Sequence, residues 1–162
     1  MICGEDRSYI CPTLVEHDSV IWSPYTVKDI ERIESVQRRF TKRLPGFCTL
    51  PYGDRLRRLN LPSLELRRLR TDLIYCYKIV FGLTHLPLSD YFQMAPLLNT
   101  RGHKFKLYKK RCSAIVRSKF FSERVVNTWN NLPSSVSFSS LRPNSFICTV
   151  KLTDLSDYLR CF

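Results

Sequence analysis

Glycine and histidine are both scarce in this chain of 162 residues. The five glycines stand singly, so the sequence contains no Gly-rich loop that could cradle a phosphate. The histidines are His17, His85 and His103, and spacing identifies no nucleophile that any of them would activate. His17 lies between Glu16 and Asp18, but adjacent residues on a helix point in different directions. The sequence therefore predicts neither P-loop chemistry nor nucleophilic catalysis.

Clustered carboxylates are also missing. Polymerases and many nucleases use such clusters to hold two divalent metal ions close together. The eight aspartates are spread along the chain, and no two of them are adjacent. Asp154 and Asp157 stand at helical spacing, but no third carboxylate accompanies them. We therefore expect no metal, no other cofactor and no self-sufficient catalytic site.

Long apolar runs and paired cysteines are absent as well. No apolar stretch approaches the length of a membrane-spanning helix. The first residues, MICGEDRSYICP, carry acids where a signal peptide needs an apolar core. The seven cysteines form no C-x-x-C pair, and no histidine lies at ligand spacing from one. These features predict reduced thiols in an intracellular protein of the nucleus and/or cytoplasm, neither secreted nor bound to a membrane.

Basic residues, by contrast, are abundant and clustered. The net charge is +12. Residues 1–37 carry three basic and seven acidic side chains, whereas residues 38–70 carry ten basic and two acidic ones. Residues 101–119 carry eight basic side chains and no acidic one. Charge of this size favours a polyanionic partner, and we expect the two blocks to form one surface.

Helix electrostatics explains only part of the first basic block. Cations near residue 40 fall at the C-terminal end of an expected helix, where they complement its dipole. The arginines between residues 55 and 70 are expected at or near helix starts, where cations are unfavourable, so they indicate an anionic partner. Guanidinium groups suit bidentate phosphate contacts. The predicted contacts to a nucleic-acid backbone are Arg38, Arg39, Lys42, Arg55, Arg57, Arg58, Arg67, Arg68, Arg70, Arg101, Lys104, Lys106, Lys109, Lys110 and Arg111.

Apolar periodicity predicts a mainly α fold, a small helical bundle with one short β-hairpin and C-terminal helices. Thr26 is a candidate N-cap for a helix that ends near Leu44, before Pro45-Gly46. Alternating residues 103–108 are expected to pair with 112–117 as the hairpin. The other expected helices cover residues 12–22, 52–59, 63–81, 119–131 and 144–159, with one turn near 88–92. The chain would then divide into a helical bundle (9–82), an irregular connection (83–100) and a basic hairpin with C-terminal helices (101–160).

Eight short strings, taken in order, resemble one protein family. They are SVIWSP (19–24), VQRRFTKR (36–43), RLRRLNLPSLELRRLR (55–70), DLI (72–74), YKI (77–79), TRGH (100–103), FFSERVVNTWNNLP (120–133) and NSF (144–146). Each string is weak alone, but the ordered set is similar to the C-terminal region of reverse transcriptases from jockey-like non-LTR retrotransposons. The resemblance covers about residues 9–147.

The resemblance implies a thumb-like region that follows the catalytic palm of an RNA-directed DNA polymerase. Its partners would be an RNA/DNA template–primer duplex and the upstream palm, with no small-molecule substrate. The catalytic aspartates and Mg²⁺ would belong to the palm, so this fragment would be inactive alone. The chain departs from the family at Met1–Ser8, which suggests a new start in a truncated copy, and after Phe146.

Two other functions compete with backbone binding. The chain could be a non-functional remnant or a protein-interaction module whose basic helices once packed on the palm and bind no nucleic acid. A helix-turn-helix that reads base sequence is disfavoured, because no short helix pair with a tight turn carries base-reading Asn, Gln and Arg together.

Overall fold

The computed structural model describes residues 18–96, 102–139 and 143–161, and over these residues the fold is mainly helical. Within the described residues, the elements are seven α-helices and a closing 3₁₀ turn. They are α2 (Val27–Lys42), α3 (Tyr52–Leu59), α4 (Leu64–Val80), α5 (Leu88–Tyr91), α6 (Ile115–Ser118), α7 (Phe121–Asn130), α8 (Pro143–Leu152) and η1 (Ser156–Tyr158).

Capping residues fix the ends of the longest helices. Thr26 is the N-cap of α2, and its hydroxyl accepts a hydrogen bond from the Asp29 N–H at 3.2 Å. Ser63 plays the same part for α4, accepting from the Leu66 N–H at 3.2 Å. Asn60 ends α3 with a left-handed backbone, φ +51°, a conformation that Asn tolerates better than most residues. These local signals explain why α2 and α4 start, and α3 ends, at or next to the predicted residues.

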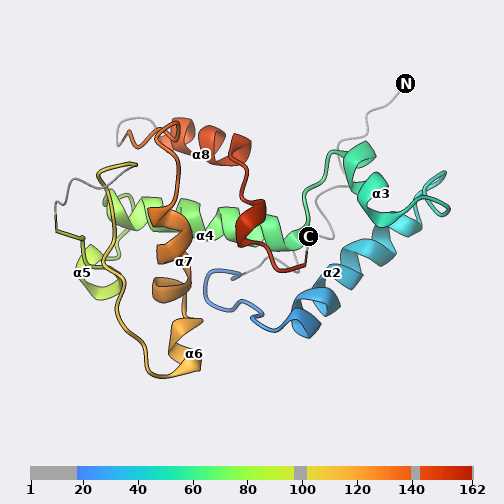
Figure 1. Ribbon diagram of the computed structural model, residues 1–162. Helices are drawn as coiled ribbons and strands as arrows, with labels where there is room; N and C mark the ends of the chain where they lie inside the picture. Colours follow the sequence, from blue (N-terminus) through green and yellow to red (C-terminus); the bar gives the residue numbers. More distant parts are fainter. Residues whose placement is uncertain (1–17, 97–101, 140–142, 162) are drawn as a thin grey trace.

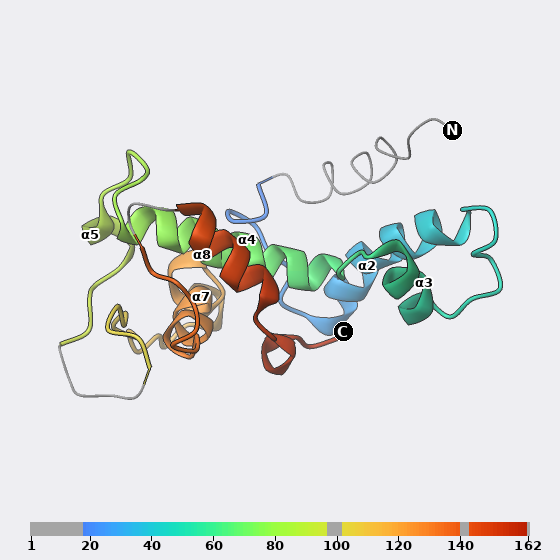
Figure 2. The same ribbon diagram turned by 90° about the horizontal axis from the view of Figure 1, so that it is seen from above.

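Helix α4 forms the long axis of the molecule (Figure 1). Helices α7 and α8 pack against its C-terminal half, whereas α2 and α3 lie at its N-terminal end and project away from the rest (Figures 1 and 2). The core lies between α4, α7 and α8, where the rings of Tyr77 and Phe146 stack 4.2 Å apart and Trp129 is fully buried. Through α4, the predicted parts 9–82 and 101–160 share this core.

The predicted β-hairpin is wrong. The described residues contain no strand; Leu107 instead forms an isolated bridge with Met94, and Ile115–Ser118 is the helical turn α6. The Asn130 side chain accepts from the Leu107 N–H and donates to the Leu107 carbonyl, both at 2.8 Å. Leu107 is also buried, at 1% exposure. The alternating segment therefore pairs with residues 93–95 and packs on α7, and it does not pair with residues 112–117.

Both ends of the chain differ from expectation. Residues 12–17 of the first expected helix lie outside the described part, and Asp18–Trp22 forms a turn in which the Ile21 N–H donates to the Asp18 carbonyl. The expected helix 144–159 ends at Leu152. The Asp154 carboxylate then accepts from the Ser156 N–H at 2.9 Å, a local bond that starts a turn.

None of the described helices combines the length and apolarity required to cross a bilayer. Five cysteines lie in the described part of the chain, namely Cys48, Cys76, Cys112, Cys148 and Cys161, and all five are free thiols.

Candidate nucleic-acid interface

A buried polar cluster joins α2 and α3 to the start of α4. Glu34 of α2 is fully buried, and its carboxylate accepts from the Tyr52 hydroxyl and, at 2.9 Å, from the Leu64 N–H at the N-terminus of α4. Gln37 donates to the Pro62 carbonyl at 3.1 Å. Burial raises the pKa of Glu34 although these hydrogen bonds oppose the shift. The cluster fixes the orientation of the two-helix arm, residues 27–60, relative to α4.

Arginines hold the arm together from inside. Arg55 of α3 donates to the Arg38 carbonyl at 2.9 Å and to the Thr41 hydroxyl at 3.2 Å. The guanidinium groups of Arg38 and Arg55 both lie over the Tyr52 ring, 5.1 and 5.3 Å from its centroid. Arg55 is buried, at 5% exposure, so it cannot reach an external phosphate in this structure. Its predicted role as a backbone contact does not fit this position.

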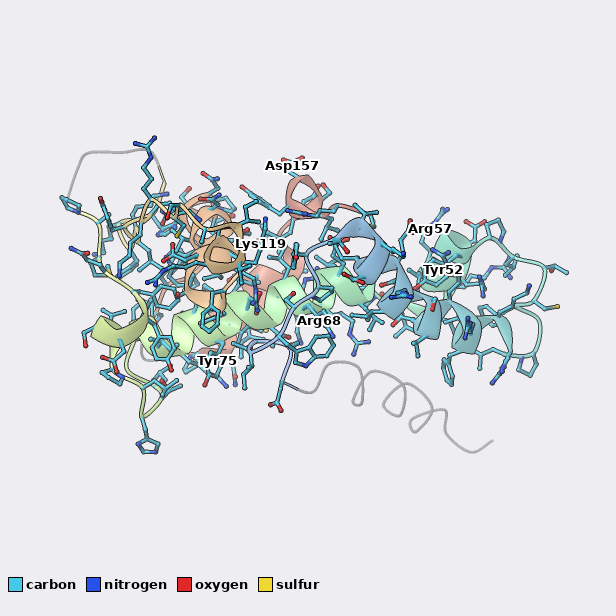
Figure 3. All side chains as sticks on the ribbon, turned by 90° about the horizontal axis from the view of Figure 1, so that it is seen from below. Tyr52, Arg57, Arg68, Tyr75, Lys119 and Asp157 are labelled. Atoms are coloured by element: carbon cyan, nitrogen blue, oxygen red, sulfur yellow. The ribbon has the colours of Figure 1, made fainter. Side chains whose placement is uncertain are left out.

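The far half of the arm concentrates exposed positive charge. Residues 38–60 carry seven basic side chains and one acid, Asp54. Figure 3 shows Arg57 and Tyr52 on α3, at the end of the molecule. The exposed cations are Arg38, Arg39, Lys42, Arg43, Arg57 and Arg58. Such a projecting basic arm can follow a phosphate backbone.

Arg57 and Arg58 do not lie at a helix start, contrary to the expectation from the sequence. Arg57 and Arg58 lie in the last turn of α3, where they complement the helix dipole and do not oppose it. Arg57 also pairs with Asp54, with Nη2 2.5 Å from Oδ1. Arg57 and Arg58 can contact a ligand because they are exposed, and not because they oppose the helix dipole.

The arginines of α4 serve the fold. Arg68 is buried, at 5% exposure, with its guanidinium 4.1 Å from the centroid of the Trp22 ring. Arg70 is half-buried and donates to the Lys151 carbonyl at 2.6 Å, at the C-terminal end of α8. Arg67 is also half-buried. The prediction that Arg68 touches a nucleic-acid backbone does not fit its burial, and Arg70 has an internal acceptor.

The second basic block lies away from the far half of the arm. Residues 102–111 run beside α7, near the opposite end of α4 from α3 in both views (Figures 1 and 2). Helix α4 has 17 residues, so its own length is about 25 Å. Arg101 lies outside the described residues. The exposed cations of the arm and residues 102–111 are therefore separate patches and not the single continuous surface that the charge pattern suggested.

Part of this second block is anchored to α7. Lys106 donates to the Asn130 carbonyl, and burial lowers its pKa. Lys109 donates to the Glu123 carbonyl at 2.6 Å. The block's exposed members, apart from Lys109, are Lys104, Lys110, Arg111 and Arg117.

An ion pair that sequence reasoning did not single out joins three distant parts of the chain. Arg124 of α7 donates from Nε and Nη2 to the two oxygens of Asp72, both at 2.8 Å. The same Nη2 donates to the carbonyls of Ser19 and Val20 at 3.1 and 2.9 Å. Burial raises the pKa of Asp72 although Arg124 opposes the shift. The available signal was an acid, Asp72, within the apolar helix pattern of residues 66–80.

The described residues contain no cluster of three or more His, Cys, Asp or Glu side chains that could hold a metal ion. Comparisons with protein-family models, with curated proteins and with solved structures find no match to this chain.

Proposed function

We propose that this chain binds the sugar–phosphate backbone of a template–primer duplex through the far half of the α2–α3 arm. The observation that carries the proposal is the projection of six exposed cations from an arm that contains one acid between residues 38 and 60. Backbone contacts need positive charge at the right spacing but no base-reading side chains. Tyr52 and Arg55, packed inside the arm, keep it rigid.

The wider proposal is that the chain is the post-palm region of a non-LTR retrotransposon reverse transcriptase, inactive alone and acting inside the cell. The ordered strings support it, as does a mainly helical fold. Three of those strings, at residues 19–24, 72–74 and 120–133, supply the groups that meet at Arg124. These strings are far apart in sequence but in contact in the structure, as expected if they are the shared residues of one family fold.

The test is binding of the purified chain to an RNA–DNA hybrid over a salt series. For contacts with Z phosphates, log K falls against log salt with a slope of about −0.9Z for duplex DNA. The six exposed cations of the arm would give a slope of about −5, whereas all fifteen predicted residues would give about −13. We expect the smaller slope, because Arg55 and Arg68 are buried and the second block lies elsewhere.

A charge-matched pair of variants locates the contact. Arg39→Glu, Lys42→Glu and Arg58→Glu together should abolish hybrid binding. The control combines Lys28→Glu, Lys78→Glu and Lys151→Glu, which changes the net charge equally at exposed positions outside the far half of the arm. Equal loss in both triple variants would show that only net charge matters, and no binding at low salt would refute the proposal.

One observation favours the competing interaction module. Ile115, Val116 and Phe120 are 71%, 75% and 60% exposed around α6. With Lys110, Arg111 and Arg117 nearby in sequence, this patch suits an acidic protein surface with an apolar centre. Failure of the hybrid to bind at low salt would favour this second function.

A further inference from the structure

A cavity lies between α2, α4 and α7, away from the far half of the arm. Its volume is about 410 Å³, within the usual range for small-ligand sites of about 300–1,000 Å³. Residues Tyr158, Leu159 and Arg160 close one side. This C-terminal segment is fastened by Glu65, which accepts from the Arg160 N–H at 2.8 Å, and by Arg160, which donates to the Tyr25 carbonyl at 2.6 Å.

The two walls of the cavity differ in chemistry. Ile30 and Ile33 of α2 and Leu69 of α4 form the apolar part of one wall, to which the same two helices also contribute charged side chains. The α6–α7 side presents Lys119 together with the polar side chains of Asn127 and Thr128. Figure 3 labels Lys119 on that side and Arg68 on α4. A ligand with a flat apolar body and polar edges would contact both walls.

The charges that line the cavity leave it positive. Five cations and three acids contribute: Arg68, Lys109, Lys119, Arg124 and Arg160 against Glu34, Glu65 and Asp72. All three acids are already hydrogen-bonded within the protein. Asp72 binds Arg124, Glu34 accepts from the Leu64 N–H, and Glu65 accepts from the N–H groups of residues 160 and 161.

Two lysines retain charge for a ligand. Lys109 is bonded to a neutral carbonyl, which does not cancel its charge. Across the described part of the chain, Lys119 has no hydrogen bond or ion pair through its ammonium group, and it is half-buried at the cavity wall. A half-buried ammonium group pairs strongly with phosphate because solvent screens it less than an exposed one.

We propose that this cavity binds one nucleoside monophosphate. The base would lie against the apolar wall, with its polar edges toward Asn127 and Thr128, and the phosphate would lie between Lys109 and Lys119. The ligand could be a free nucleotide or the terminal nucleotide of a strand. The site is separate from the arm and adds a small ligand to the partners expected from the sequence.

Titration calorimetry of the full chain with AMP tests the site, with adenosine and inorganic phosphate as partial ligands. We expect AMP to bind at least about tenfold more tightly than either part, because each part meets only one kind of wall. Lys119→Glu should weaken AMP binding by about tenfold or more, whereas Lys78→Glu, an equal charge change outside the cavity, should leave it within about twofold. Circular dichroism establishes that both variants are folded.

Three results would overturn the proposal: no AMP binding at millimolar concentration, equal binding of adenosine and AMP, or equal weakening by Lys78→Glu. The arm triple variant should bind AMP normally, and Lys119→Glu should retain hybrid binding, so the two proposals can fail separately. If AMP binds and a hybrid with a one-nucleotide overhang competes where a blunt hybrid does not, the ligand is a strand end. If AMP binds and neither hybrid competes, the ligand is the free nucleotide.

Discussion

Arg124→Met should cost this fold more stability than a change at any exposed arginine. The substitution keeps the volume of the side chain but removes its charge and its five donors. Asp72, whose side chain is 6% exposed, would lose both hydrogen bonds from Arg124, and the carbonyls of Ser19 and Val20 would lose their common donor. Removing one member of a buried ion pair costs about 3–5 kcal/mol, so we expect about 4 kcal/mol at pH 7.5.

Urea unfolding, followed by the fluorescence of the fully buried Trp129, measures the loss. With a urea dependence of about 2 kcal/mol per molar, the unfolding midpoint should fall by about 2 M. Arg117→Met is the matched control, because Arg117 is exposed and the same substitution there should change stability by less than about 0.5 kcal/mol.

The loss of stability in Arg124→Met should depend on pH, whereas the loss from a simple packing defect should not. In the native protein, burial already raises the pKa of Asp72, and removing Arg124 raises it further. A carboxyl group whose pKa is higher in the folded than in the unfolded protein contributes most to folding stability at pH values below its unfolded pKa. That contribution is lost as the pH rises through the folded pKa. The gap between Arg124→Met and the parent should therefore narrow from pH 7.5 to pH 4.5.

A double variant separates charge from packing. Asp72→Leu combined with Arg124→Met removes the stranded carboxylate and should be more stable than Arg124→Met alone. A stability gap that stays constant from pH 4.5 to 7.5, or a double variant no more stable than the single one, would refute the account of a buried ion pair.

The other predictions use the same unfolding assay. Asn130→Ala should cost about 1–3 kcal/mol, because the buried backbone of Leu107 loses both of its partners, whereas Asn144→Ala at an exposed position should cost little. Gly82→Ala should cost about 1–2 kcal/mol because its φ is +64°, although nothing lies within 4 Å of an added Cβ. Glu34→Gln should make the free energy of unfolding less dependent on pH. Because the pKa of Glu34 is raised in the folded protein, this residue contributes stability that is lost as the pH rises. The variant should therefore lose most stability, relative to the parent, at acidic pH.

The helices could be predicted because their signals are local. Thr26, Ser63 and Asn60 each satisfy or terminate a helix within three residues, and the apolar period of residues 66–80 needs no distant partner. The hairpin failed for the opposite reason. Leu107 is extended because it bridges to Met94 and because Asn130, 23 residues away, holds its backbone, and no local pattern reveals these contacts.

The sequence alone could not predict which arginines are buried and which are exposed either. Charge is visible in the sequence, but burial depends on tertiary neighbours. Arg55 and Arg57 stand two residues apart in one short helix, yet Arg55 is 5% exposed and bonded to α2, whereas Arg57 faces solvent. Helical geometry explains the difference only once it is known which side of α3 packs on α2.

Some residues of the family-like strings are buried in contacts that hold the fold, and others are exposed cations. Ser19, Asp72 and Arg124 come from three of those strings and meet at one guanidinium group, so the strings record how the chain folds. The cations proposed to bind a duplex come from two other strings, residues 36–43 and 55–70, and lie on the far half of the arm. A change at Arg124 should therefore lower stability and, in the molecules that remain folded, leave the salt slope of hybrid binding intact. A change at Arg58 should leave stability intact and make the salt slope of hybrid binding smaller. Measuring both quantities on both variants distinguishes residues that define the fold from residues that give it a partner.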